Sequence, residues 1–216
     1  MKIKVLKWSG NGMEYGDYNN PENWVGGFYE LSIEYRPFDD EKRLNEALNA
    51  LCKSSFFNGI WEEKKYYKKH SISLPIDIEG ESVNQFYGTL FLSEDNELPC
   101  VISVVRVSGE SDWLDIAIPQ ATFEKKYPYK YPLTKELNPW LNKVDEMYTQ
   151  LAEIIFSNSP FDFAMIGEEI SGYTNQEEIT VEVIKNITCI LPIQLQKKLG
   201  LQGEGKELSK QLRIFD

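Results

Sequence analysis

The chain has 216 residues, with 34 acidic side chains against 23 basic ones and a single histidine, so its formal net charge is −11. This charge disfavours binding to phosphate backbones and to anionic lipid, and it favours basic partners. One histidine leaves few of the usual options for acid–base catalysis or zinc binding. With 42% hydrophobic residues, the chain can bury a core, and we expect a folded globular protein.

The first eight residues, MKIKVLKW, alternate lysine with apolar residues. This alternation predicts a strand, and it lacks the uninterrupted apolar stretch of a signal peptide. No other segment approaches the roughly 20 apolar residues that span a bilayer. We therefore expect a cytoplasmic protein with reduced, buried thiols at Cys52, Cys100 and Cys189, which lie in apolar settings without metal-site spacing.

The next segment predicts a strand followed by a helix. From Tyr29 to Tyr35 the odd positions are apolar and the even ones polar, which is the pattern of a half-buried strand. A helix then begins near Asp39 or Asp40, because either side chain can cap free amide groups. The helix places Leu44, Ala47, Leu48 and Leu51 on one face, so we expect it to pack on a sheet.

The middle of the chain predicts more strands. Apolar residues alternate with polar residues or proline at Ile72, Leu74, Ile76 and Ile78. Residues 86–92 and 101–107 are apolar on both faces, which is typical of strands covered on both sides. The polar residues 94–97 between them predict an antiparallel hairpin, and a further strand is expected over 113–118.

The last third alternates helices and strands. Asn138-Pro139 predicts a helix start, and an apolar stripe follows from Leu141 to Ile155. Residues 161–166 predict a strand that ends at Gly167. Over 174–183 a capping box (Thr174-x-x-Glu177) favours a helix, although the apolar spacing also fits a strand. A helix over 192–199 is expected to end at Gly200.

Together these elements predict an α+β fold, with a mixed, mainly antiparallel sheet and two or more amphipathic helices packed on it. We expect a single domain over residues 1–216. The segment 127–132 is rich in tyrosine and proline, and proline disfavours helix at the preceding residue. We therefore interpret 127–132 as an extended connection.

The sharpest acidic feature is Glu168-Glu169, which follows the strand predicted over 161–166. Carboxylates at such a position can hold Mg²⁺ or present charge to a partner. Asp162, Asp112 and Asp115 could complete a metal-dependent hydrolase site. However, adjacent strand residues point to opposite faces, and no metal motif of fixed spacing is present. We expect no metal and no cofactor.

The basic cluster at residues 64–70 follows Glu62 and Glu63, so we interpret it as a solvated edge and not as a nucleic-acid site. We likewise expect no membrane partner. Trp24 and Tyr129 lie in polar segments, and such aromatic residues are favoured at protein interfaces. The alternative, that they hold loops against the core, stays open at this point.

Two segments carry a resemblance to a known class of proteins. WVGGFYEL at 24–31, followed by an amphipathic helix, and FDFAMIGEE at 161–169 resemble parts of the α+β immunity proteins of bacterial polymorphic-toxin systems. Those proteins neutralise toxins by binding them. The resemblance implies an inhibitor without enzymatic activity.

We therefore expect a non-enzymatic, acidic binding protein whose partner is a basic toxin such as a nuclease. Its partner-binding residues are predicted to be Asp112, Asp115, Glu168, Glu169, Glu177, Glu178, Trp24 and Tyr129. Two alternatives remain, a carboxylate-based metal-dependent hydrolase and a structural subunit of a larger assembly.

Overall fold

The computed structural model describes residues 18–67, 69–93 and 96–216, so the strand predicted over 1–8 lies outside the described residues. The described chain forms, in order, η1 (Pro21–Trp24), β1 (Phe28–Tyr35), α2 (Glu41–Lys53), β2 (Phe57–Trp61), η2 (Lys64–Tyr66), β3 (Val83–Ser93), β4 (Asn96–Arg106), β5 (Asp112–Pro119), α3 (Gln120–Lys126), α4 (Leu141–Asn158), β6 (Phe163–Glu168), α5 (Val181–Ile184), β7 (Thr188–Pro192), α6 (Ile193–Leu199), β8 (Lys206–Ser209) and β9 (Leu212–Phe215).

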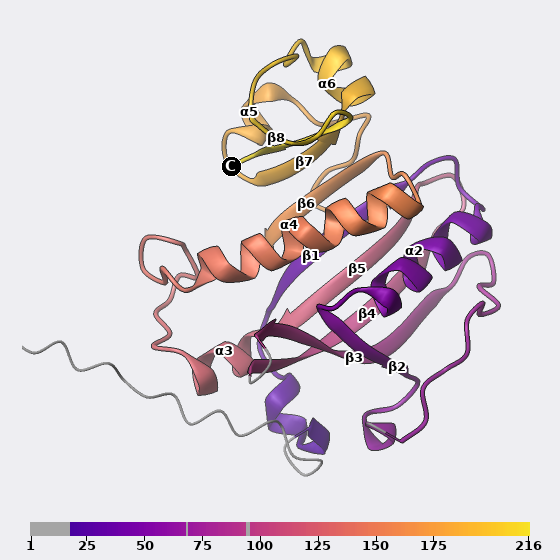
Figure 1. The fold of residues 1–216 in the computed structure, drawn as a ribbon, viewed down its shortest axis with the longest axis vertical. Coiled ribbons are helices and arrows are strands. Elements are labelled where there is room, and N and C mark those ends of the chain that lie inside the picture. Colours follow the sequence, from indigo (N-terminus) through magenta and orange to yellow (C-terminus); the bar gives the residue numbers. More distant parts are fainter. Residues whose placement is uncertain (1–17, 68, 94–95) are drawn as a thin grey trace, which may run out of the picture.

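One nine-stranded sheet runs through this part of the chain, in the order β2-β3-β4-β5-β1-β6-β7-β9-β8 (Figure 1). All of its neighbouring strands pair antiparallel, so the sheet is not mixed as the sequence suggested. The α+β class is confirmed. Because β1 lies between β5 and β6, it forms the middle of the sheet and defines the two faces.

Alternation along β1 separates an apolar face from a polar one. The odd residues Tyr29, Leu31 and Ile33 belong to the main hydrophobic core. The even residues Glu30, Ser32 and Glu34 point to the opposite face, yet they are buried as well. The strand is therefore buried on both faces, and polar groups line one of them.

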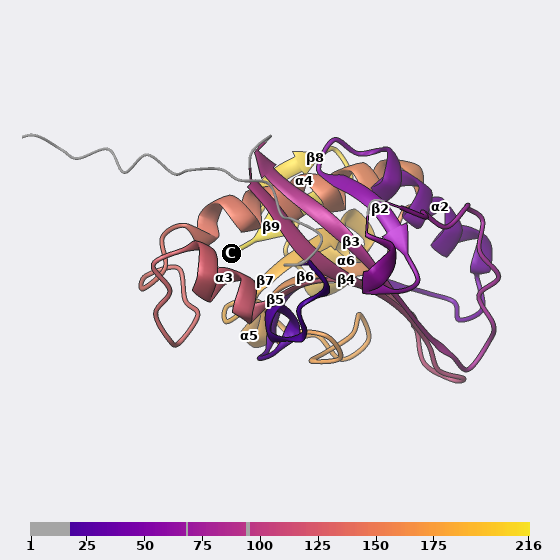
Figure 2. The ribbon, with the colours of Figure 1, turned by 90° about the horizontal axis from the view of Figure 1, so that it is seen from below.

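Helices α2 and α4 cover the apolar face, and they lie side by side on it (Figure 2). Asp40 caps α2 as predicted, because its Oδ1 accepts a hydrogen bond from the Arg43 amide at 3.1 Å. The residues expected on the inner face of α2 are all buried, and so is most of the predicted stripe of α4. Both helices thus pack on the sheet as their spacing predicted.

Helix α4 begins later than predicted, because the side chain of Asn138 does not cap it. Asn138 is fully buried, and its side chain pairs instead with the backbone of Lys130, accepting from the amide at 2.8 Å and donating to the carbonyl at 2.7 Å. These bonds fold the connection at 127–132 against the protein. The connection therefore joins α3 to α4 and is held against the chain just before α4.

The C-terminal region differs most from the sequence expectations. The predicted capping box at Thr174 does not start a helix, since Thr180 caps the four-residue helix α5 instead. Helix α6 ends as expected at Gly200, which has φ +74°, a left-handed conformation that glycine adopts without strain. The hairpin of β8 and β9, which extends the sheet, was not predicted. A second, smaller core lies here, around Phe163, Met165 and Leu195.

The hairpin of β3 and β4 is confirmed, but the expected cover on both of its faces is only partly present. On the face away from α2 and α4, Val83 is 67% exposed and Val105 is half-buried.

Of the three cysteines, Cys100 and Cys189 are buried as expected, whereas Cys52 is half-buried. Burial raises the pKa of the Cys52 thiol to about 11. No helix among the described residues has the length and apolar character needed to cross a bilayer.

Candidate functional site: an acidic groove beside helix α2

A groove of about 420 Å³ lies between helix α2 and the segment that follows η2. Helix α2 contributes polar and charged side chains to one wall. Leu74 and Pro75, from the other segment, provide apolar surface. The residues that line the groove are Glu41, Lys42, Asn45, Glu46, Asn49, Leu74 and Pro75.

The far wall of the groove is extended chain, where the sequence predicted a strand. Residues 72–78 keep the predicted alternation, with even residues turned inward and odd ones exposed, but the structure assigns no strand to them. Asn45 takes the place of a neighbouring strand: its Nδ2 donates to the Ile76 carbonyl at 3.0 Å, and its Oδ1 accepts from the Ile76 amide at 2.8 Å. A side chain of α2 thus fixes the distance between the two walls.

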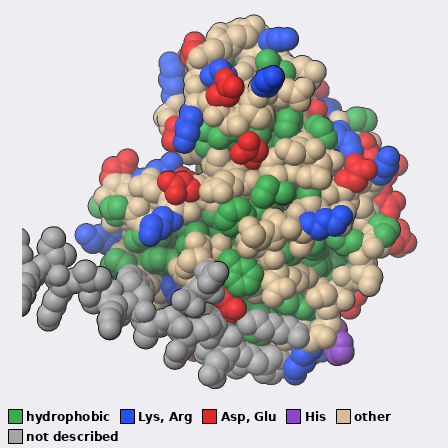
Figure 3. Space-filling model, viewed as in Figure 1, with side chains coloured by type: hydrophobic (Ala, Val, Ile, Leu, Met, Phe, Trp, Pro, Cys, Tyr) green, Lys and Arg blue, Asp and Glu red, His purple; other side chains and the backbone are tan. Residues whose placement is uncertain are grey.

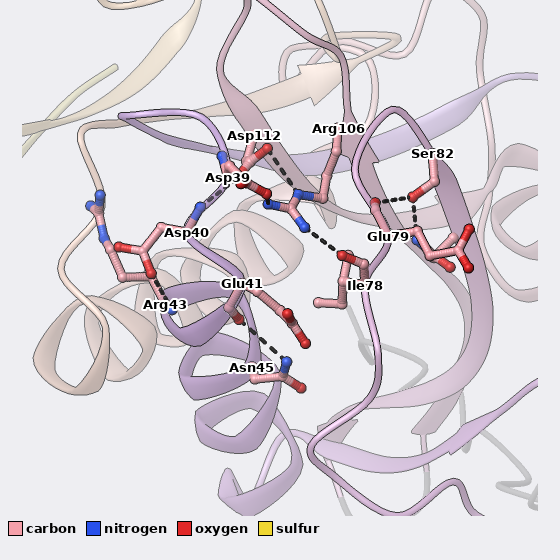
Figure 4. Close-up of polar contacts among 11 residues, drawn as sticks. Asp39, Asp40, Glu41, Arg43, Asn45, Ile78, Glu79, Ser82, Arg106 and Asp112 are labelled. Carbon is pink, nitrogen blue, oxygen red and sulfur yellow. Dashed lines mark hydrogen bonds and ion pairs between the residues drawn. The ribbon is translucent and has the colours of Figure 1, made fainter.

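The end of the groove near the start of α2 is held by Arg106, the last residue of β4 (Figure 4). The side chain of Arg106 is only 1% exposed. Its Nε donates to Asp112 Oδ1 at 3.2 Å, one Nη donates to Asp39 Oδ1 at 2.6 Å, and the other donates to the Ile78 carbonyl. One guanidinium group therefore joins β4, β5, the start of α2 and the segment that forms the far wall.

Asp112 completes this network. Its second oxygen accepts hydrogen bonds from the backbone amides of Asp39, at 3.0 Å, and Asp40, at 3.3 Å. Asp39 has φ +74°, a conformation that costs free energy for a residue other than glycine and persists only where its surroundings hold it. The contacts with Arg106 and Asp112 hold it there. The side chain of Asp39 nevertheless remains 69% exposed, so it also presents charge to solvent.

The groove lies in an acidic surface. Residues 39–46 and 77–81 contain seven carboxylates against two basic residues, Lys42 and Arg43. Arg43 is already paired with Asp162 at 3.0 Å, and Lys42 lies 3.7 Å from Glu46. Figure 3 shows acidic side chains gathered on the side of the molecule that carries α2. The seven carboxylates belong to Asp39, Asp40, Glu41, Glu46, Asp77, Glu79 and Glu81.

Two of the residues predicted to bind a partner are not at the surface. Asp112 is fully buried in the Arg106 network, and Asp115 is 5% exposed on the opposite face of the sheet. In Asp115 the two oxygens accept from the hydroxyl groups of Ser32 and Ser171, at 2.5 and 2.9 Å. The prediction that Asp112 and Asp115 face a partner was therefore wrong, because both faces of the sheet are covered: Asp112 is buried by the Arg106 network and Asp115 by the segment that carries Ser171.

Glu168, Glu169 and Tyr129 do come together, at the start of β1. Glu168 pairs with Tyr29 in the sheet, and Glu169 accepts a hydrogen bond from the Phe28 amide at 2.6 Å. The Tyr129 hydroxyl accepts from Gln120 Nε2 at 2.5 Å. Burial, together with the nearby carboxylates of Glu168 and Glu124, raises the pKa of Tyr129. These residues form a second, smaller acidic corner away from the groove.

Trp24 lies in a cluster of aromatic side chains. Its Nε1 donates to the Tyr18 carbonyl at 2.8 Å, and its ring meets Tyr18 and Tyr87 edge to face. The Lys64 Nζ lies 4.4 Å from the centre of the Trp24 ring. These contacts hold η1 against β3 and favour the packing interpretation of Trp24 over a role at an interface.

Glu177 and Glu178 lie at the other end of β1. Both are exposed, and Glu177 pairs at 2.5 Å with Arg36, the residue after β1. Since Glu168 pairs with Tyr29, the two acidic pairs are separated by the length of β1, roughly 20 Å at about 3.3 Å per residue. The eight predicted residues therefore do not form one surface.

Sequence analysis missed the groove, although part of its signal was present. Asp39 and Asp40 were interpreted only as a helix start, Asp77 only as a polar residue within the alternating segment 72–78, and Glu79 was not singled out. What brings them together is the Arg106 network and the pairing of Asn45 with Ile76. Neither contact could be found from spacing in the sequence.

Among the described residues, no group of three or more His, Cys, Asp or Glu side chains has an arrangement that could hold a metal ion. One wall of the acidic groove carries Glu41 and Glu46 beside Lys42, and the other is apolar. This arrangement suits a cationic side chain with an apolar stem. Comparison of the chain with protein-family models, characterised proteins and solved structures found no significant match.

Replacing Arg106 should strongly destabilise the protein. An Arg106→Met variant leaves the buried Asp112 without its cation, and we expect the free energy of unfolding to fall by about 3–5 kcal/mol. Urea unfolding measures this change. The control is Arg36→Met, which removes a more exposed ion pair and should cost no more than about 1 kcal/mol. Equal losses in the two variants would contradict the role assigned to Arg106.

Removing the Asn45 side chain should loosen the far wall of the groove. Asn45→Ala breaks two hydrogen bonds to Ile76, and we expect a loss of about 1–2 kcal/mol in unfolding free energy with faster hydrogen exchange at the Ile76 amide. Asn49→Ala is the matched control, because Asn49 is exposed on the same helix. If Ile76 exchanges at the same rate in both variants, Asn45 does not hold the wall.

Proposed function

We propose that the protein binds a basic protein partner in the acidic groove beside α2 and acts as a non-enzymatic inhibitor, as the immunity proteins of bacterial polymorphic-toxin systems do. The observation that carries this proposal is the groove itself, which combines an excess of carboxylates with an apolar wall on fixed elements. The net charge of −11 supports a basic partner over nucleic acid or anionic lipid.

The chemistry of the groove favours lysine or arginine side chains from the partner. Leu74 and Pro75 provide apolar contact for the methylene stem of such a side chain. Glu41 and Glu46, on the facing wall, provide carboxylates for its charged head. Carboxylates paired with arginine or lysine form stronger hydrogen bonds than neutral groups do, so each such contact adds to specificity.

The groove is also held ready for a partner. Its walls are a regular helix and a segment fixed by Asn45 and Arg106, so little conformational entropy remains to be lost on binding. Long-range attraction between the acidic surface and a basic partner would speed their encounter. An inhibitor that must capture a toxin quickly benefits from both properties.

Charge reversal in the groove should slow capture of the partner. A bait carrying Glu41→Lys and Glu46→Lys is compared with wild type in a pull-down from host lysate at low salt, with elution by a salt gradient and identification by mass spectrometry. We expect wild type to retain a stoichiometric basic protein. Once that protein is purified, its association with the variant should be about tenfold slower or more at low ionic strength.

Two further baits distinguish an effect of where the reversed charges lie from an effect of the protein's net charge. Glu182→Lys with Glu204→Lys makes the same change in net charge at exposed positions in the C-terminal region, and it should leave association nearly unchanged. Glu168→Lys with Glu169→Lys tests the acidic corner at the start of β1. A loss of binding confined to this last bait would move the proposed site to that corner, and a folded wild-type bait that retains no basic protein would refute the proposal.

A further inference from the structure

The face of the sheet opposite α2 and α4 carries a row of three buried carboxylates. Glu30 and Glu34 lie on β1 and are 7% and 0% exposed, and Asp115 lies on β5 beside Ser32. Unlike Asp112, none of the three forms an ion pair with a lysine or arginine in the described part of the chain. Their partners are hydroxyl groups and backbone amides.

The segment between β6 and α5 closes over this row through direct hydrogen bonds. The Ser171 amide donates to Glu30 Oε2 at 2.9 Å, and the Ser171 hydroxyl donates to Asp115 Oδ2 at the same distance. Farther along, the Gln176 amide donates to Glu34 Oε2 at 2.7 Å. We call residues 171–178 the cover and Glu30, Glu34 and Asp115 the carboxylate row.

The cover is fixed at its two ends and polar between them. Ile170 and Ile179, which flank it, are each 4% exposed, and both belong to the second hydrophobic core. Between these anchors Gly172 has φ +70°, and Tyr173 is 59% exposed.

Besides the carboxylate row, the cover is held by the ion pair of Glu177 with Arg36 at 2.5 Å and by a hydrogen bond from Lys198 Nζ to the Gln176 carbonyl at 2.9 Å. The row supplies the buried contacts beneath the cover, whereas these two contacts lie at its exposed side.

We infer that the cover is a proton-controlled device, which is closed while the carboxylate row holds protons and opens when the row is ionised. In the closed form the carboxyl groups are removed from water. A neutral carboxyl group tolerates this environment, whereas an ionised one without a cation does not. Opening the cover hydrates the row and relieves the penalty.

The direction of the pH dependence follows from the groups that face the row. Burial raises the pKa of Glu30 from 4.5 to about 7, hydrogen bonds from backbone amides oppose this, and the charges of Asp115 and Glu169 add to it. Burial also raises the pKa of Asp115, against the hydroxyl bonds of Ser32 and Ser171.

The pKa of Glu34 depends on the same opposing effects of burial and hydrogen bonding. Burial raises its pKa with help from Asp162, while the Ser111 hydroxyl, the Gln176 amide and Arg36 lower it. Because the closed form holds the Glu30 proton more tightly than the open form, the stability that this proton adds is complete below about pH 4.5 and is lost as the pH rises through about 7. Glu34 and Asp115 add to the effect in the same direction. Opening then brings three more carboxylates to the surface at neutral and alkaline pH.

Amide hydrogen exchange at pH 5 and pH 8 tests this inference in the wild-type protein. After correction for the intrinsic exchange rates, we expect the Ser171 and Gln176 amides to be at least about tenfold less protected at pH 8, since one pKa unit corresponds to a tenfold change. Amides of the central strands, such as Ile102, serve as the internal reference. Equal protection of the cover at both pH values would overturn the inference.

A Glu30→Gln variant identifies the group responsible. The amide oxygen can still accept from Ser171, but it does not titrate, so most of the pH dependence should disappear. Glu182→Gln, an exposed change in α5, should keep it. If Glu30→Gln retains the full dependence, Glu30 does not control the cover.

Titration of the Glu30 carboxyl group in the wild-type protein tests the same inference, and its result does not depend on whether the Glu30→Gln variant folds. The side-chain carboxyl carbon of Glu30, followed by NMR, should titrate with a midpoint near pH 7. A midpoint below pH 5 would overturn the inference.

Discussion

Arg106 carries a full positive charge with only 1% of its side chain exposed, and removing such an ion from water costs several kcal/mol unless its partners compensate. Here the compensation comes from Asp112, Asp39 and the Ile78 carbonyl, which belong to three different parts of the chain. Satisfying this one group therefore forces β4, β5, the start of α2 and the segment before β3 into one arrangement. The acidic groove exists because those elements meet.

The two faces of the sheet bury carboxylates in different ways. On the helical face Asp112 is paired with a cation, the guanidinium group of Arg106. On the other face Glu30 and Asp115 have only hydroxyl and amide donors, so proton uptake is the remaining way to lower the cost of burial. The first arrangement gives a fixed support for the groove, and the second gives the inferred cover its dependence on pH.

Local patterns in the sequence predicted most of the central fold. The alternation of 29–35, the capped helix after Asp40 and the apolar stripe of α4 were each confirmed, because periodicity and capping depend on neighbours in the chain. Predictions failed where a distant side chain decides the structure. Asn45 replaces a strand partner for Ile76, and Asn138 binds Lys130 instead of capping α4.

The candidate site was harder to predict than the fold, for the same reason. Acidic residues are frequent in this chain, and their exposure depends on which distant segments pack over them. Asp112 and Asp115 were expected at the surface and are buried, whereas Glu41 and Glu46 were not singled out and line the groove. Spacing alone cannot identify which carboxylates remain free to meet a partner.

Whether a basic partner contacts the groove can be measured by zero-length carbodiimide cross-linking, because this reagent joins a carboxylate to a lysine amine within contact distance. The captured complex is cross-linked, digested and analysed by mass spectrometry, with Asp112, which is buried in the Arg106 network, as an internal negative control. We expect cross-links from Glu41, Glu46, Asp77 or Glu79 to lysines of the partner. Cross-links confined to Glu168, Glu169, Glu177 or Glu178 would contradict the proposal.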